Sequence, residues 1–123
     1  DVFTAMQHAN GKFGPARRLE GEINTPANEF DASFLSDGSS IVFARAMDFR
    51  TDRVDTFFAP RREGRYGAGT LLPETVNSGD RDTYGAMLDW SHPNRFTVSA
   101  RKAGAASLDL YLVRYTLEPE LSR

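Results

Sequence analysis

Apolar and polar residues alternate along most of the chain, and no stretch repeats its apolar residues with the period of a helix. This alternation predicts short β-strands separated by turns that are rich in Gly, Asn, Asp and Ser. We expect an all-β protein with nine strands and with no helix anywhere in residues 30–61. The expected strands are residues 1–7, 16–20, 30–35, 41–47, 54–61, 70–73, 83–89, 95–101 and 108–116.

The stretch "SDGSS" at residues 36–40 predicts a tight turn between two of these strands. Ser36 and Asp37 can accept hydrogen bonds from backbone N–H groups two residues further on, and Gly38 can adopt a positive φ. Asp37 is therefore interpreted as a turn-forming residue and not as a catalytic one.

Short sequence patterns recur along the chain. The segments "DVFTAMQ", "DTFFAPR" and "DLYLVRY" begin at Asp1, Asp55 and Asp109, which are 54 positions apart in each case. The segment "EFDASFLS" from Glu29 likewise matches "DTYGAMLD" from Asp82. The chain therefore reads as a repeat of four short strands, and four antiparallel strands per repeat are typical of a β-propeller blade.

The strands of each predicted blade are called A to D, from the inside of the propeller outward. Because a closed propeller needs roughly 4–8 blades, this chain alone predicts an incomplete ring. Such a ring belongs to a fragment of a longer protein or is completed by association of several copies. The predicted parts are strands C and D in residues 1–20, a complete blade in 30–73, and strands A to C in 83–116. The side chains predicted to be buried are Phe34, Ile41, Phe43, Phe57 and Leu112.

The segment "EFDASFLSDGSSIVFAR", residues 29–45, resembles the strand–turn–strand signature of WD40-like β-propeller repeats of the TolB type. The preceding segment "GKFGPARRLEGEINTPANE" is similar to the linker of a subgroup of that family. The second copy departs from the pattern, since "DWSHPN" stands where the first has "SDG". The resemblance implies a propeller fold, a periplasmic or secreted location, and a protein or glycan partner.

Composition removes several classes of function. The chain has 15 basic and 17 acidic residues, a balance that argues against a dedicated nucleic-acid-binding protein. It has no cysteine, which excludes disulfides and thiolate metal sites, and no apolar run approaches the roughly 18 residues of a membrane span. Because the chain begins in what reads as mid-strand, we expect a fragment or a processed chain. No serine-hydrolase elbow or nucleotide-binding glycine motif occurs, so no catalytic residue and no cofactor are predicted.

Acidic and arginine residues recur at one end of the predicted blades. Glu29 and Asp31 begin one strand A and Arg45 lies near the end of its partner, while Asp82 and Arg101 hold similar places in the next copy. Antiparallel pairing brings such ends together. The preferred interpretation is a cross-strand ion pair that sets the register of each blade. The alternative is a charged ring at the mouth of the central channel that binds a partner.

The loop after residue 47 adds further charges to the same predicted face. The acidic residues in and just after this loop, Asp48, Asp52 and Asp55, lack the ligand spacing of known calcium loops, so no metal site is predicted. The two histidines, His8 and His92, fall in turns of separate blades and are interpreted as exposed. The candidate partner-binding residues are Glu29, Asp31, Arg45, Asp48, Arg50, Asp52, Arg53, Asp82 and Arg101.

A second group of charges, Arg61, Arg62 and Arg65, lies on a predicted hairpin beside Tyr66. It is interpreted mainly as a solubilising edge. The alternative is that Tyr66 stacks on a base or a sugar.

These patterns lead to one main hypothesis and two alternatives. The main hypothesis is a non-catalytic propeller module for protein or glycan binding and assembly. The first alternative is the propeller domain of a larger hydrolase, and the second is a self-assembling fragment in which two or three chains build one ring. Fold resemblance alone does not decide among them.

Overall fold

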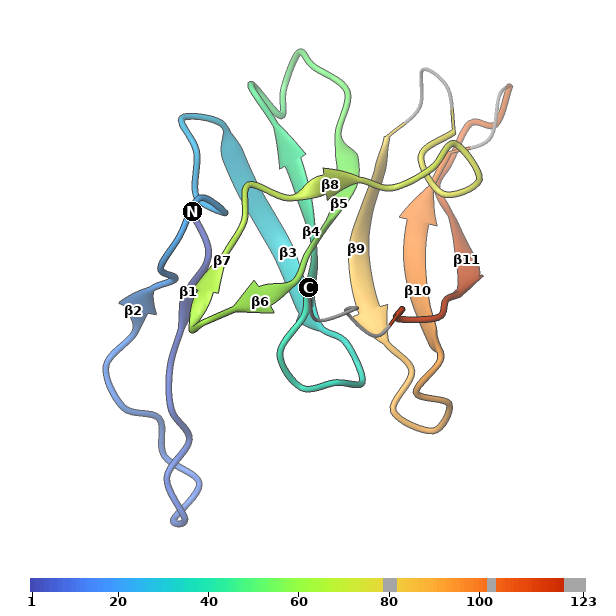
Figure 1. Ribbon diagram of the computed structural model, residues 1–123. Coiled ribbons are helices and arrows are strands. Elements are labelled where there is room, and N and C mark those ends of the chain that lie inside the picture. The colour runs from blue at the N-terminus through green and yellow to red at the C-terminus, as the bar shows by residue number, and fades with distance from the viewer. Residues whose placement is uncertain (79–81, 102–103, 119–123) are drawn as a thin grey trace.

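The computed structural model describes residues 1–78, 82–101 and 104–118, and within them the chain is all-β and has no helix (Figure 1). The all-β fold class and the absence of helix in residues 30–61 are thus confirmed. The strands are β1 (Phe3–Thr4), β2 (Arg17–Arg18), β3 (Asn28–Phe34), β4 (Ile41–Ala46), β5 (Asp55–Ala59), β6 (Arg61–Arg62), β7 (Arg65–Tyr66), β8 (Thr70–Leu71), β9 (Thr83–Leu88), β10 (Arg95–Ala100) and β11 (Asp109–Arg114).

These strands form small antiparallel sheets that stand side by side (Figure 1). The central sheet has four strands in the order β3-β4-β5-β8, and the next has three in the order β9-β10-β11. On the other side of the central sheet, β1 pairs with β2, and β6 pairs with β7 in a short hairpin. The described residues form no closed ring, and the assignment of these sheets to propeller blades stays a prediction at this point.

The sheets pack face to face through two large hydrophobic clusters, and a smaller third cluster lies near the end of β4. Side chains alternate between the two faces of a strand, so β4 contributes to both large clusters. Ile41 and Phe43 pack toward β1 and β2, where they join Val2 and Leu19 in one cluster. Val42 points the other way and joins a second cluster, formed with Leu35, Ala86, Leu88, Phe96 and Val98. Because β4 is buried on both faces, its sequence is a continuous apolar run interrupted only near its end.

The prediction of buried side chains is right for the centre of the molecule and wrong at its two sides. Ile41 and Phe43 are buried as expected, and Phe57 is partly buried. Phe34 and Leu112, however, are 43% and 50% exposed. Phe34 faces the side of β1 and β2, whose two short strands do not cover it. Leu112 faces away from the central sheet, and none of the described residues packs over that face.

The turn at residues 36–40 forms as the sequence predicts. Oδ1 of Asp37 accepts hydrogen bonds from the N–H groups of Ser39 and Ser40 at 3.0 and 2.8 Å, and Gly38 has a φ of 69°. Desolvation acts to raise the pKa of Asp37, but the hydrogen bonds from Ser40 and Ser39 outweigh it and lower that pKa below its ordinary value. Asp37 therefore closes the turn that joins β3 to β4. Ser36 instead contacts Tyr115, whose hydroxyl oxygen lies 3.1 Å from its Oγ.

Two strands shift register at corresponding places. Asp31 in β3 and Gly85 in β9 are 54 positions apart, and both have a positive φ, of 50° and 69°. Each lies where its strand shifts register against the next strand, β4 or β10. Such an irregularity changes which side chains face the core. Directly before it in each strand, Phe30 and Tyr84 pack on the same small cluster of Ala44, Ala46 and Val54.

Two asparagines 53 positions apart make the same contacts. Nδ2 of Asn24 donates to the carbonyl of Val2 at 3.1 Å, and its Oδ1 accepts from the N–H of Val2. Nδ2 of Asn77 donates to the carbonyl of Thr56 at 2.9 Å, and its Oδ1 accepts from the N–H of Thr56 at 2.8 Å. Each side chain also donates to a leucine carbonyl, at 3.4 Å from Asn24 and 2.8 Å from Asn77. Each asparagine therefore ties a loop to the two strands beside it.

Candidate functional site

The first predicted pair of charges is an ion pair inside the fold. Glu29 and Arg45 are opposite each other at the ends of β3 and β4, and Nε of Arg45 lies 3.1 Å from Oε1 of Glu29. The same guanidinium donates to the carbonyls of Ile23 and Ala68 at 2.9 and 2.8 Å. Oε1 of Glu29 also accepts hydrogen bonds from the N–H and the hydroxyl of Thr25. This pair ties two loops to the end of the sheet.

Aromatic rings hold the Arg45 side chain on its other side. The guanidinium carbon lies 5.0 Å from the ring centroid of Phe43 and 4.8 Å from that of Phe57, and the two rings stack on each other. The Arg45 side chain is only 15% exposed and that of Glu29 is fully buried. A carboxylate held in this way has no open side for a partner. The contacts favour the interpretation that this pair sets the register of the sheet.

The second predicted pair does not form. No ion pair joins Asp82 to Arg101, although both residues belong to the described part of the chain. Instead, Oδ1 of Asp82 accepts a hydrogen bond from the N–H of Val54 at 3.0 Å, and Arg101 is exposed. The residues that oppose each other at this end of the sheet are Thr83 and Ala100. Thr83 and Ala100 hold the places that correspond to Glu29 and Arg45, and Asp82 and Arg101 are the next residues beyond them. Because Asp82 binds the backbone of Val54 instead of Arg101, the charged pair does not recur.

The remaining candidate residues lie at the same end of the molecule without forming a common site. Figure 1 shows the start of β3, the loop after β4, the start of β9 and the end of β10 at one end. In that loop, Asp48 accepts from the N–H of Arg50 at 2.9 Å, and Asp52 accepts from the N–H of Asp48 at 3.0 Å. Arg53 pairs with Asp55 at 2.8 Å. These hydrogen bonds shape the loop itself.

Tyr66 is buried, which overturns the alternative that it stacks on a base or a sugar. It is 5% exposed, and its hydroxyl donates to the carbonyl of Ser39 at 2.6 Å. Its backbone pairs with Gly21, where a Cβ atom would come within 2.0 Å of the Tyr66 carbonyl oxygen. Burial raises the pKa of the Tyr66 hydroxyl, Arg61 opposes this, and Asp37 adds to it. The ring therefore joins the β6–β7 hairpin to the central sheet.

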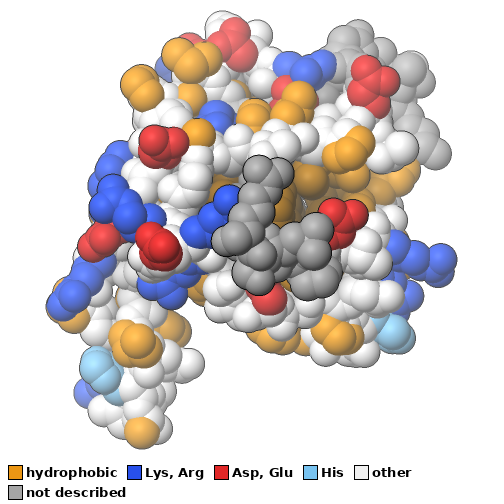
Figure 2. Space-filling view, viewed as in Figure 1, with side chains coloured by type: hydrophobic (Ala, Val, Ile, Leu, Met, Phe, Trp, Pro, Cys, Tyr) orange, Lys and Arg blue, Asp and Glu red, His pale blue; other side chains and the backbone are white. Residues whose placement is uncertain are grey.

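A groove lies between the central sheet and the segment that follows β11, close to the turn at residues 36–40. We call it the inter-sheet groove, and its volume is about 870 Å³. Figure 2 shows a hollow with hydrophobic side chains in this part of the molecule. Its apolar lining consists of Leu35, Val42, Phe58, Pro60, Leu72, Phe96 and Leu117. Its polar lining consists of Asp37, Ser39, Ser40, Arg61, Arg62, Tyr115, Thr116 and Glu118.

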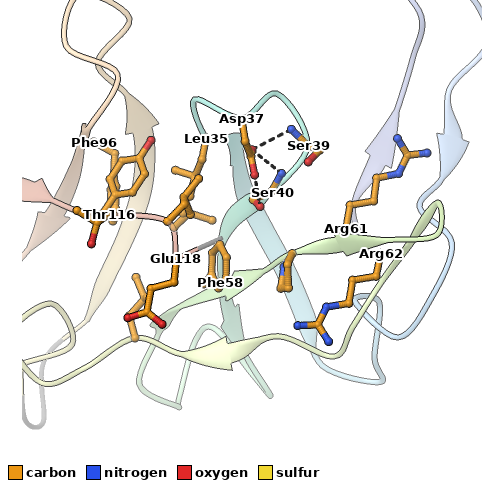
Figure 3. Close-up of a pocket in the computed structure, with 15 residues that line it drawn as sticks. Leu35, Asp37, Ser39, Ser40, Phe58, Arg61, Arg62, Phe96, Thr116 and Glu118 are labelled. Atoms are coloured by element: carbon orange, nitrogen blue, oxygen red, sulfur yellow. Dashed lines mark hydrogen bonds between the residues drawn. The ribbon is translucent and has the colours of Figure 1, made fainter. Parts of the chain in front are cut away.

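The charges of the inter-sheet groove lie at opposite sides. Figure 3 shows Arg61 and Arg62 on one side and Glu118 on the other, with Phe58 between them. Both arginines are exposed and belong to β6, and Figure 2 shows Lys and Arg side chains gathered over β2, β6 and β7. The groove thus combines an apolar floor with a cationic rim on the side of β6 and with Glu118 on the opposite side. An apolar floor with a few polar groups at its edges is typical of ligand-binding clefts.

Tyr115 holds one wall of the inter-sheet groove in place. Its hydroxyl donates to the carbonyl of Pro93 at 2.6 Å and accepts from the N–H of Ser36 at 3.2 Å. Its ring packs on Phe96 with centroids 5.6 Å apart. Tyr115 therefore connects the turn before β4 with the turn before β10.

The sequence does not predict the inter-sheet groove, because the walls of the groove come from strands that are far apart in the chain. Its pattern of charges identifies Arg61 and Arg62 only as a solubilising edge. The one local signal is the apolar pair of Phe58 and Leu72 on each side of this charged hairpin. That signal does not tell which partner element faces the pair.

The other candidates contribute no further site. His8 and His92 are exposed, as expected, and His92 lies 3.4 Å from Asp89. Within residues 1–78, 82–101 and 104–118, no three His, Asp or Glu side chains cluster as a metal site would require. That part of the chain also contains no helix that is long and apolar enough to span a membrane.

Comparison of the chain with protein-family models, with curated proteins and with solved structures found no match.

Proposed function

We propose that this chain is part of a non-catalytic β-propeller module that binds a protein partner, and that a peptide segment of this partner lies in the inter-sheet groove. The propeller part of the proposal rests on the contacts that recur with the sequence period. Asn24 and Asn77 make the same hydrogen bonds, and Asp31 and Gly85 mark the same irregularity in β3 and β9. By its resemblance to TolB-type proteins, the module belongs in the periplasm or outside the cell.

The observation that carries the binding function is the inter-sheet groove itself. A floor of aliphatic and aromatic side chains suits an apolar side chain of a peptide, and Arg61 and Arg62 suit a carboxylate. The charged residues that the sequence predicts as partner-binding lie at the other end of the molecule, and their contacts are within the fold. This supports the choice of the groove as the binding site. Glu29 and Arg45 bind each other and nearby loops.

The test is a titration of the isotope-labelled protein with short peptides, followed by nuclear magnetic resonance. A pentapeptide of alternating glutamate and phenylalanine is expected to shift the amide signals of Ser40, Phe58 and Arg61. The double variant R61E/R62E is expected to weaken this binding at least about tenfold, because it replaces attraction by repulsion. The matched control is R17E, since Arg17 is exposed on β2 and does not line the groove.

Two results would contradict the proposal. One is the absence of shifts around the groove with the acidic peptide at millimolar concentration. The other is equal binding of a pentapeptide of alternating lysine and phenylalanine, because the cationic rim would then have no effect on affinity. Shifts caused by cellohexaose but by neither peptide would assign the groove to a glycan instead.

A further inference from the structure

The last sheet presents an apolar face that the described residues leave uncovered. Along β11, Tyr111 and Val113 point toward the central sheet and are partly buried. Leu110 and Leu112 point the other way and are 76% and 50% exposed, and Met87 on β9 is 67% exposed. We call Met87, Leu110 and Leu112 the trailing face.

The corresponding face of the central sheet shows what covers such a surface. Phe58 on β5 is 54 positions before Leu112 and, like it, faces the following part of the chain. Phe58 and Val42 are covered by side chains of the three-stranded sheet, among them Leu88 and Phe96. One sheet therefore covers this face of the sheet before it, through the aromatic and aliphatic side chains that it directs backward.

The opposite side of the molecule exposes side chains of the kind that make this cover. Phe3 on β1 is 56% exposed, and its counterpart 54 positions later is Phe57, which packs on the cluster around Phe43. Phe13 is 66% exposed, and its counterpart 53 positions later is Tyr66, which is 5% exposed. We call Phe3 and Phe13 the leading face.

We propose that two copies of this chain associate head to tail, with the leading face of one copy packed on the trailing face of the other. The inference rests on the proposed propeller repeat and specifies how copies would continue it. One chain carries both faces, and its two internal contacts between sheets show how faces of these types fit. Because the faces differ, the contact is heterologous, so that it extends into a ring or an open chain.

The occupant is a second copy because each face lacks what the other supplies. The trailing face carries aliphatic side chains, and the leading face carries two phenylalanine rings. Burial of large apolar side chains is the main source of affinity in such contacts. A symmetric contact would place like face on like face and would match neither of the two internal contacts.

The test measures the mass of the full chain by sedimentation velocity and light scattering over a range of concentrations. The mass is expected to rise with concentration from one chain to two and more. The variants L110E/L112E and F3E/F13E are each expected to weaken association at least about tenfold. M47E is the matched control, since Met47 is 67% exposed and belongs to neither face.

A mixture of the two variants separates a head-to-tail contact from a symmetric one. Each variant keeps one intact face, so an equimolar mixture is expected to form dimers that grow no further. A wild-type chain that stays monomeric up to millimolar concentration would overturn the proposal and leave the trailing face to another partner. A mixture that stays monomeric while the wild type associates would overturn it as well.

The peptide titration distinguishes this proposal from the proposed function. Both double variants keep the inter-sheet groove, so they are expected to bind the acidic pentapeptide as the wild type does. Peptide binding by a strictly monomeric chain would defeat only the head-to-tail contact. Head-to-tail association of a chain that does not bind the peptide would contradict only the proposed binding function of the groove.

Discussion

The two contacts between neighbouring sheets both contain an apolar layer, and they differ in the space beside the turn at residues 36–40. In the contact between β1–β2 and the central sheet, the ring of Tyr66 fills the space beside the turn at residues 36–40. In the contact between the central and the three-stranded sheet, the described residues beside the same turn line the inter-sheet groove. Both contacts have an apolar layer, and among the described residues the first is filled beside this turn by the Tyr66 ring, whereas the second contains the groove.

The central and the three-stranded sheet also differ in the residue pair at the end where β3 and β9 begin. Glu29 and Arg45 close the end of the central sheet with charges, and Thr83 and Ala100 close the end of the next sheet without them. The hydroxyl of Thr56 donates to the Thr83 carbonyl at 2.8 Å, so the neutral end is also hydrogen-bonded. A buried polar end therefore needs partners and not charge as such. The pair of Glu29 and Arg45 thus stabilises the end of the central sheet, and no matching charged pair forms among the described residues of the next sheet.

Replacement of Gly21 by alanine is expected to have the largest effect, because it attacks the filled contact directly. The new Cβ would meet the Tyr66 carbonyl oxygen at 2.0 Å, and the φ of 107° is unfavourable for alanine. We expect a loss of about 4 kcal/mol in the free energy of unfolding, measured by urea denaturation.

Gly11 is the matched control for this substitution. It has a φ of 80°, but a Cβ atom added there would meet nothing within 4 Å beyond its chain neighbours. Its replacement by alanine is expected to cost only about 1 kcal/mol, from backbone strain alone. Equal losses in the two variants would show that the close approach of Tyr66 to Gly21 does not hold the first contact together.

Removal of the Glu29 carboxylate is expected to have the next largest effect. The variant E29A leaves the largely buried Arg45 guanidinium without its counter-ion and should lower the free energy of unfolding by about 3 kcal/mol. The double variant E29M/R45M should recover part of this loss, because it leaves no unpaired charge. Urea denaturation measures both.

The variant D82A is the control at the neutral end. It removes one hydrogen bond and should lower the free energy of unfolding by about 1 kcal/mol. A loss as large as that of E29A would mean that the two ends are equivalent.

The smallest effect on stability is expected from substitutions in the turns before β4 and β10. These two turns resemble each other more than the two contacts between sheets do. The pKa of Asp37 is lowered in the folded protein, so its contribution is complete above the pKa of the unfolded chain. That contribution is lost as the pH falls through the lower, folded pKa. The variant D37N is therefore expected to reduce the loss of thermal stability between neutral pH and about pH 3.

Asp89 allows the same measurement in the turn before β10. Hydrogen bonds from the Ser91 hydroxyl and N–H, with His92 and Arg95 nearby, lower its pKa against an opposing effect of desolvation. D89N is expected to change the acid stability in the same direction as D37N. A steeper loss of stability in acid for either variant would reverse the sign and contradict the role of these carboxylates in the turns.

Much of the fold follows from local sequence signals. Alternation predicts the strands, "SDGSS" predicts the turn that Asp37 closes, and the period of 54 residues matches the spacing of Asp31 and Gly85. The antiparallel ion pair of Glu29 and Arg45 also follows from their places at neighbouring strand ends. In each of these cases, the contacts lie within one hairpin or recur with the period.

The errors arise where a residue depends on elements beyond its own hairpin. Phe34 and Leu112 belong to apolar runs like those of buried strands, but no described sheet covers them. Asp82 and Arg101 satisfy the pattern of charges, but Asp82 accepts a hydrogen bond from the N–H of Val54, beside the central sheet, instead of pairing with Arg101. Tyr66 belongs to a charged hairpin that reads as exposed, yet Gly21 leaves room for its backbone.

By itself, the sequence determined the all-β class, the antiparallel strands and the turn chemistry, because these depend on side-chain alternation and on the φ preferences of a few residues. The tertiary structure alone decided which faces are covered, which charges pair, and where a groove remains. Those properties depend on which strands meet from distant parts of the chain, as those of Phe58 and Phe96 do. A pattern along the chain does not encode such a meeting, since strands with the same alternation look alike in the sequence whether or not a neighbour covers them.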